Sequence, residues 1–260
     1  MDPSKGPRRL ALLIDADNAQ PAVIDELLAE VARFGSATVK RIYGDWTSPR
    51  HGQWKRRLLK HSIQPVQQFA YTTGKNATDS ALIIDAMDLL YTGRFDGFCL
   101  MSSDSDFTRL AQRIREEGLL VYGFGEKKTP EAFVAACDKF IYTEVLRGDD
   151  KSDGKREEEA RGAEADTEAA DLGPQKDQPL PPPDAVQLIS KAIAEADDDD
   201  GWAALATVGN YINQLRPDFD PRLFGFKKLS SLVRSFPKRF ELREQALANS
   251  DTRVLYVRKR

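Results

Sequence analysis

The sequence predicts an α/β protein, with a three-layer domain built on a parallel sheet and a small winged-helix domain after it. Three observations support this prediction. Apolar, strand-like runs alternate with helical patterns over residues 1–146, and short acidic stretches follow these runs. The alternation stops at residue 147, and a shorter, helix-rich pattern begins near residue 184.

In the first domain, strands that alternate with helices of 10 to 15 residues favour a parallel sheet covered on both faces. Pro21 suits the first turn of the first helix, and Gly35 suits its end. The expected strands are residues 9–14, 37–43, 63–69, 97–101, 119–124 and a short 140–143. The expected helices are residues 21–34, 53–61, 78–90, 107–117 and 130–137.

Residues 147–183 are rich in charged residues and glycine, lack aromatic residues and end in a run of prolines. Such a segment cannot bury enough apolar surface to offset its ordering entropy, so it is predicted to be a disordered acidic and proline-rich linker. The second domain is expected over residues 184–260. Its pattern predicts helices at 186–193, 204–215 and 228–234, and a hairpin of 240–242 with 254–257.

Three acidic stretches lie near the predicted strand exits: residues 15–18 (Asp-Ala-Asp-Asn), 75–79 (Lys-Asn-Ala-Thr-Asp) and 102–106 (Ser-Ser-Asp-Ser-Asp). An aspartate after a strand is most often a helix cap or a turn residue. Three such stretches at three junctions indicate more, because ligands bind outside the carboxyl ends of strands in an open α/β sheet. Carboxylates gathered there repel one another, and a hard divalent cation with oxygen ligands relieves that repulsion.

Other kinds of site fit this sequence less well. A dinucleotide site expects a glycine-rich turn after the first strand, and residues 15–18 contain no glycine. A Ser-His-Asp hydrolase is disfavoured because neither histidine, His51 or His61, follows a strand, and zinc is disfavoured for want of Cys and His ligands. A phosphohydrolase that uses Asp15 as a nucleophile on small phosphate esters stays open as a third interpretation.

Residues 8–146 resemble the NYN family of PIN-like ribonucleases, of the LabA-like kind, which have a three-layer α/β fold. The resemblance rests on Leu-Leu-Ile-Asp-Ala-Asp-Asn-Ala at 12–19, on Lys75 with Asp79 and Asp85, and on Ser-Ser-Asp-Ser-Asp-Phe at 102–107. It implies a Mg²⁺ or Mn²⁺ site with Asn18 beside the ion to hold a ligand or a water. The implied metal ligands are Asp15, Asp79, Asp104 and Asp106.

Several side chains near these motifs are candidates for contact with RNA. Lys75 could reach the scissile phosphate, and the Ser103 hydroxyl could contact an RNA phosphate. The alternative for Ser103, and for Thr108, is to cap the helix that begins near residue 107. Arg56 and Arg57 form part of a basic helix, and basic charge attracts phosphates. A solvated helix face is the alternative for the two arginines.

Residues 184–260 resemble an OST-HTH (LOTUS) domain, a winged-helix module that binds RNA or protein partners. The most telling stretch is Phe-Gly-Phe-Lys-Lys-Leu at 224–229. From Trp202 to the end there are 12 basic and 5 acidic residues, a balance that favours nucleic acid. The expected RNA-binding residues here are Lys227, Lys228, Arg234, Lys238 and Arg239.

The composition is that of a soluble globular protein, with 41% hydrophobic and 30% charged residues, and no apolar run reaches the roughly 20 residues that span a bilayer. Two cysteines without metal-ligand spacing, Cys99 in a strand and Cys137 in a helix, suggest buried thiols in a reducing cytoplasm. The sequence thus predicts a cytoplasmic, metal-dependent endoribonuclease that acts on single-stranded RNA through an accessory RNA-binding module. The alternative is a catalytically silent RNA-binding or scaffold protein whose acidic pocket only holds a cation.

Overall fold

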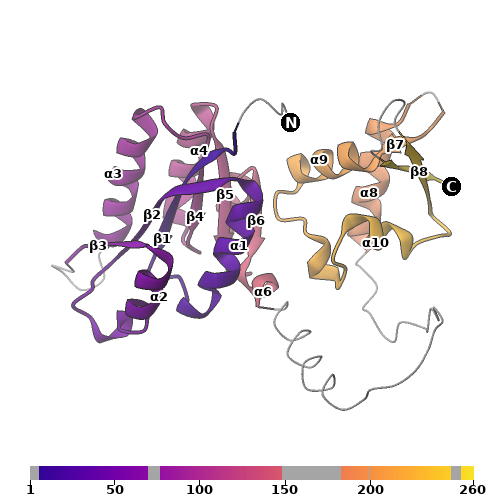
Figure 1. Ribbon diagram of the computed structural model, residues 1–260. Helices are drawn as coiled ribbons and strands as arrows, with labels where there is room; N and C mark the ends of the chain where they lie inside the picture. Colours follow the sequence, from indigo (N-terminus) through magenta and orange to yellow (C-terminus); the bar gives the residue numbers. More distant parts are fainter. Residues whose placement is uncertain (1–5, 70–76, 148–182, 199, 247–252) are drawn as a thin grey trace, which may run out of the picture. The chain divides into compact units, whose positions relative to one another are not determined.

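A computed structural model describes residues 6–69, 77–147, 183–198, 200–246 and 253–260 of the chain. The chain divides into two compact units, residues 1–154 and 155–260 (Figure 1). All of the predicted linker except Arg147 and Pro183 lies outside the described residues. No helix in the described part of the chain is both long and apolar enough to cross a membrane.

The first unit is built on a six-stranded sheet in the order β3-β2-β1-β4-β5-β6, and every neighbouring pair of strands is parallel. From β1 the chain moves outward to β2 and β3 on one side, then returns to build β4, β5 and β6 on the other. The switch point of the topology therefore lies between the carboxyl ends of β1 and β4. The strands are β1 (Arg9–Asp15), β2 (Ser36–Gly44), β3 (Gln64–Gln67), β4 (Gly97–Met101), β5 (Leu120–Gly125) and β6 (Lys139–Tyr142).

Helices cover both faces of this sheet, which confirms the predicted three layers. Along β1, Leu10, Leu12 and Ile14 belong to one buried cluster, whereas Ala11 and Leu13 belong to the other, as the two-residue period of a strand requires. The first cluster includes side chains of α1 (Ile24–Phe34), α2 (Trp54–His61) and α6 (Thr143–Leu146). The second includes side chains of α3 (Ala77–Tyr91), α4 (Thr108–Glu116) and α5 (Glu131–Ala135).

Several predicted boundaries shift in the structure. Strand β3, Gln64–Gln67, is shorter than the predicted strand at 63–69, and Ile63 is buried just before it begins. The predicted helix at 21–34 opens with a 3-10 turn, Pro21–Val23, and a second such turn, Ser105–Phe107, precedes α4. Cys137 is not in a helix, since α5 ends at Ala135, although both cysteines are free and buried as predicted.

The second unit combines helices with a small antiparallel sheet in the order β7-β9-β8. The predicted hairpin is present, and its register pairs Leu242 with Val257. Its core lies between the helices and one face of this sheet, and it includes Ile189, Val208 and Leu232. The elements are α8 (Pro183–Ala196), β7 (Ala203–Ala204), α9 (Leu205–Leu215), the 3-10 turn Pro221–Phe224, α10 (Leu229–Arg234), β8 (Phe240–Ala246) and β9 (Arg253–Lys259).

Candidate functional site

The last residue of β1, Asp15, lies beside the switch point of the sheet and is fully buried. Three donors hold its carboxylate: the backbone N–H of Asp17 at 3.0 Å, Asn18 Nδ2 at 2.7 Å and Ser102 Oγ at 2.8 Å. Ser102 comes directly after β4, so its hydroxyl links the ends of the two central strands. Burial raises the pKa of Asp15, and these hydrogen bonds oppose that rise.

Three further carboxylates form an acidic trio, Asp79, Asp104 and Asp106, in which one oxygen from each lies within 4.8 Å of the others. Asp79 is in the first turn of α3, and Asp104 and Asp106 are in the loop and 3-10 turn after β4. Asp104 Oδ1 accepts a hydrogen bond from the backbone N–H of Asp106 at 2.9 Å, while its own N–H donates to Ser102 Oγ at 3.1 Å. Ser102 therefore touches both Asp15 and the loop that carries two of the trio.

The electrostatics of the trio depend on all of its neighbours. Burial, followed by the charges of Asp15, Asp104, Asp106 and Asp17, raises the pKa of Asp79 to about 6. A carboxyl group whose pKa is raised by burial and by like charges is stabilised in its charged form when a cation binds beside it. The donors are all carboxylate oxygens and the trio is only partly buried, so the residues fit a hard divalent ion that keeps some of its water ligands.

These positions match a known domain family. The family model of the NYN domain matches residues 9–146, more than half of the chain. The chain belongs to the NYN domain family. NYN domains are PIN-like nuclease domains, and a second family model, the OST-HTH/LOTUS domain, matches residues 181–250. OST-HTH/LOTUS domains bind RNA.

Other comparisons add little about function. No curated protein matches the chain significantly. A crystal structure of a protein of unknown function from Vibrio parahaemolyticus is similar at 17% identity over 54% of this chain and 94% of that chain, with a TM-score of 0.46. A solution structure of an uncharacterized protein from Nitrosomonas europaea shares 36% identity over 37% of this chain and 89% of that chain, with a TM-score of 0.28.

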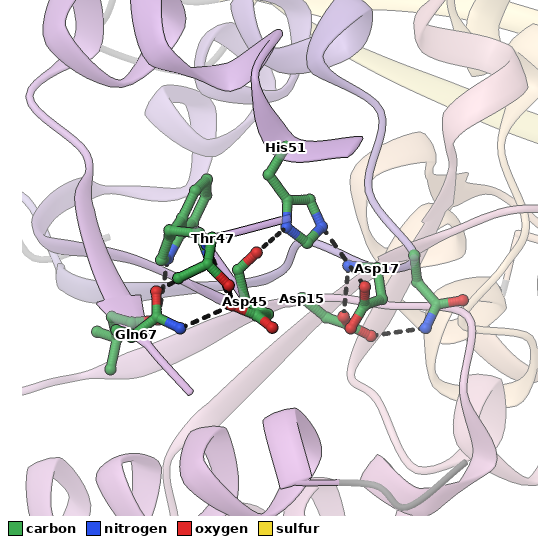
Figure 2. Close-up of polar contacts among 9 residues, drawn as sticks. Asp15, Asp17, Asp45, Thr47, His51 and Gln67 are labelled. Atoms are coloured by element: carbon green, nitrogen blue, oxygen red, sulfur yellow. Dashed lines mark hydrogen bonds and ion pairs between the residues drawn. The ribbon is translucent and has the colours of Figure 1, made fainter. Parts of the chain in front are cut away.

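Within the NYN domain, the structure adds a residue that the sequence did not point to. His51 is buried, and its Nδ1 lies 2.9 Å from the backbone carbonyl oxygen of Asp45 (Figure 2). Because a carbonyl oxygen only accepts hydrogen bonds, Nδ1 carries a proton, and Nε2 faces Asp17 Oδ1 at 3.4 Å. His51 therefore connects the loop after β2 to the acidic segment after β1. No local pattern could have predicted this, because 34 residues separate His51 from Asp17.

The predicted RNA-binding residues of the NYN domain have different environments. Lys75 lies outside the described residues, and Arg56 is exposed on α2. Arg57 forms an ion pair with Asp25 of α1. Ser103 does not cap a helix: its hydroxyl accepts a hydrogen bond from the backbone N–H of Glu126 at 2.9 Å.

A side-chain cap expected from Ser103 or Thr108 is found at the 3-10 turn Ser105–Phe107, where Asp104 supplies it, whereas α4 itself has no side-chain cap. The Asp104 carboxylate reaches the backbone N–H two residues on, which the hydroxyl of Ser103 does not do. Asp85, further along α3, accepts hydrogen bonds from Arg41 and from the Tyr43 hydroxyl of β2. In the OST-HTH/LOTUS domain the five predicted basic residues are all exposed: Lys227, Lys228, Arg234, Lys238 and Arg239.

Proposed function

We propose that this protein is a divalent-metal-dependent endoribonuclease that cleaves single-stranded RNA and uses its C-terminal domain as an accessory RNA-binding module. The observation that carries the proposal is the acidic trio beside Asp15, at the topological switch point of an NYN domain. Ligands of open α/β sheets bind at this point, and a phosphodiester there would lie against the carboxylates that hold the ion. Two free, buried thiols support a cytoplasmic location.

The chain's own residues have distinct parts in this proposal. The trio and Asp15 would hold Mg²⁺ or Mn²⁺, and such an ion activates water and stabilises negative charge on phosphate oxygens. Asn18 and Ser102 fix the orientation of the Asp15 carboxylate through their hydrogen bonds to it. This arrangement requires no histidine as a general base.

RNA would reach the site through basic side chains on both domains. Exposed basic groups attract phosphates. When one domain has bound an RNA, the other domain of the same chain meets that RNA at a high effective concentration, so two weak contacts can combine into tighter binding. The C-terminal domain could also take a protein partner. The proposed RNA contacts are Lys75, Ser103, Arg56, Arg57, Lys227, Lys228, Arg234, Lys238 and Arg239.

The test is cleavage of end-labelled single-stranded RNA by the purified chain, with Mg²⁺ or Mn²⁺ and with EDTA. Asp104→Asn and Asp15→Asn should lose at least about 100-fold in rate, in line with removal of a group that fixes a catalytic ion. The matched control is Asp88→Asn, an exposed carboxylate on α3, which should keep full activity. The RNA should be cut internally, and the same assay with single-stranded DNA measures the preference for RNA.

Two results would contradict this proposal. Equal activity in wild type and in both site variants would assign the cleavage to a contaminant. Tight RNA binding without cleavage, whichever ion is present, would favour the catalytically silent scaffold, and hydrolysis of small phosphate esters alone would favour the phosphohydrolase.

A further inference from the structure

Two arginine side chains cover Trp202 of the second unit. Trp202 is buried, with 8% of its surface exposed, but it does not belong to the apolar cluster that includes Ile189, Val208 and Leu232. The guanidinium carbon of Arg243 lies 4.4 Å from the ring centroid of Trp202, and that of Arg258 lies 4.7 Å from it. Arg243 is also 6.0 Å from the ring centroid of Tyr256. Two cations and two aromatic rings thus form one cluster.

The register of the sheet places this cluster on one face. Arg243 of β8 is directly opposite Tyr256 of β9, and Glu241 is directly opposite Arg258. The intervening residues, Leu242 and Val257, face the core. Since side chains alternate along a strand, the cluster lies on the outer face of the sheet. We call Trp202, Arg243, Tyr256 and Arg258 the outer-face cluster.

Stacking orients the two arginines without using their hydrogen-bonding capacity. A guanidinium group that lies over an aromatic ring contacts it through its flat face, and its N–H groups point outward in a fixed fork. This fork matches the oxygens of a phosphate, and preorganisation lowers the entropy lost on binding. Each arginine uses one nitrogen in a hydrogen bond within the sheet. Arg243, which is exposed, donates from Nη2 to Gln245 Oε1 at 3.2 Å, and Arg258 donates from Nη2 to the Glu241 carboxylate at 2.7 Å.

The cluster differs from the basic residues predicted from sequence, which precede β8. Half of it, Tyr256 and Arg258, lies beyond residue 250, where the match to the OST-HTH/LOTUS model ends. Arg260 also lies near the Glu241 carboxylate, so three arginines surround that group: Arg243, Arg258 and Arg260. The exposed carboxylates of Asp198 and Asp200 come just before Trp202, and Asp198 Oδ1 accepts a hydrogen bond from the backbone N–H of Trp202 at 2.8 Å. Arginines beside aromatic rings are the combination that binds single-stranded nucleic acid.

We propose that the outer face of the β7-β9-β8 sheet is a surface that binds single-stranded RNA. Arg243 and Arg258 bind phosphates there, and a base stacks on the Tyr256 ring. The inference rests on the RNA-binding half of the proposed function and is independent of cleavage. Arg260 adds a further cation directly after β9, which ends at Lys259.

The experiment is a titration of fluorescently labelled single-stranded RNA with the full chain in EDTA, so that cleavage plays no part. Arg243→Ala and Arg258→Ala should each weaken binding by about fivefold or more. Each should also reduce the slope of log affinity against log salt by about 0.7, the effect of one lost phosphate contact on a single strand. The matched control is Arg253→Ala, which removes the same charge from an exposed position of β9 on the other face, and should change affinity by less than about twofold.

Two further variants separate this surface from general electrostatics and from misfolding. Arg243→Lys keeps the charge but loses the flat, forked geometry, so it should bind more weakly than wild type. Glu241→Gln frees Arg258 and should strengthen binding about twofold or more over Glu244→Gln, which removes a carboxylate of β8 from the other face. A gain in affinity cannot come from a damaged fold.

The outcomes distinguish the inference from the function on which it rests. If the wild-type chain binds RNA and Arg243→Ala binds no differently from Arg253→Ala, the outer-face surface is wrong and the proposed function stands. Wild-type affinity in Arg243→Lys would likewise overturn the role of stacking. If the wild-type chain fails to bind any single-stranded RNA, the RNA-binding half of the proposed function is itself wrong.

Discussion

Asp85 provides a sharp test of where the acidic site ends along α3. It lies six residues after Asp79 and is one of the residues that carry the resemblance to the NYN family. Its two carboxylate oxygens accept hydrogen bonds from Arg41 and from the Tyr43 hydroxyl, which ties α3 to β2. The side chains of Arg41 and Asp85 are 27% and 23% exposed, so the ion pair is largely shielded from water. We predict that Asp85→Asn lowers stability without altering the site.

The size of the effect follows from these two hydrogen bonds. A bond to a charged group contributes about 1.5–3 kcal/mol, and a neutral one about 0.5–1.5 kcal/mol. Asparagine keeps one acceptor, so one bond is lost and the other is weakened, for a total near 2 kcal/mol. In a domain of this size that loss lowers Tm by roughly 4–8 °C.

Scanning calorimetry of the full chain measures this loss in the transition of the first unit. Asp88→Asn, at an exposed position one turn along α3, is the matched control and should shift Tm by less than about 1–2 °C. Mn²⁺ affinity and RNA cleavage at 25 °C should equal those of wild type in both variants. An Asp85→Asn protein that melts normally but no longer binds Mn²⁺ would refute the reasoning and place Asp85 among the metal ligands.

Three further predictions use the same measurement. In EDTA, the Tm of wild type minus that of Asp79→Asn should fall as pH rises from about 4 to 7. The reason is that the folded-state pKa of Asp79, about 6, lies above the usual 3.8, so the folded protein binds the proton more tightly than the unfolded chain does. Added Mn²⁺ should reverse this trend, and a Tm difference that does not change with pH would contradict the prediction. His51→Ala should lower stability by about 1–2 kcal/mol, because the Asp45 carbonyl loses its donor, and an unchanged Tm would contradict that role. Gly123→Ala should lower stability by about 1–3 kcal/mol, because its Cβ would lie 2.4 Å from Phe140 Cδ2; a neutral result would mean that the ring can move aside.

Most of the first unit could be predicted from hydrophobic runs. Strand β4 was predicted with its observed ends, because Gly97–Met101 is apolar throughout and buried on both faces of a central strand. The predicted length of strand β3 is too long, since an edge strand carries polar residues that give no clear signal of where the strand ends. Pro65 fits there because an edge strand does not need every backbone donor.

The site was predictable only where local sequence decides geometry. Asp104 follows a strand, and sequence placed it at the sheet edge where the structure finds it with Asp106. The contact between Ser102 and Asp15 depends on which strands are neighbours, and a single sequence does not show that. Arg57 shows the same limit. The sequence pattern predicts a basic helix face, but it cannot show that Arg57 forms an ion pair with Asp25 of another helix, α1.

Asp79 is the strongest reason to regard the acidic residues as a ligand site and not as ordinary turn chemistry. Asp104 and Asp15 both accept backbone N–H groups two residues on, and that bond alone would explain a carboxylate after a strand. Asp79 is different, because burial and four neighbouring carboxylates raise its pKa to about 6, so its charged form destabilises the folded protein near neutral pH. A carboxylate in the first turn of α3 gains from the helix dipole, but only modestly, whereas a divalent ion would turn the repulsion between these carboxylates into attraction. The cost of keeping a charged carboxylate in the folded protein thus falls on Asp79, the residue that completes the trio. The trio lies at the carboxyl ends of the strands, where an NYN domain is expected to bind its substrate.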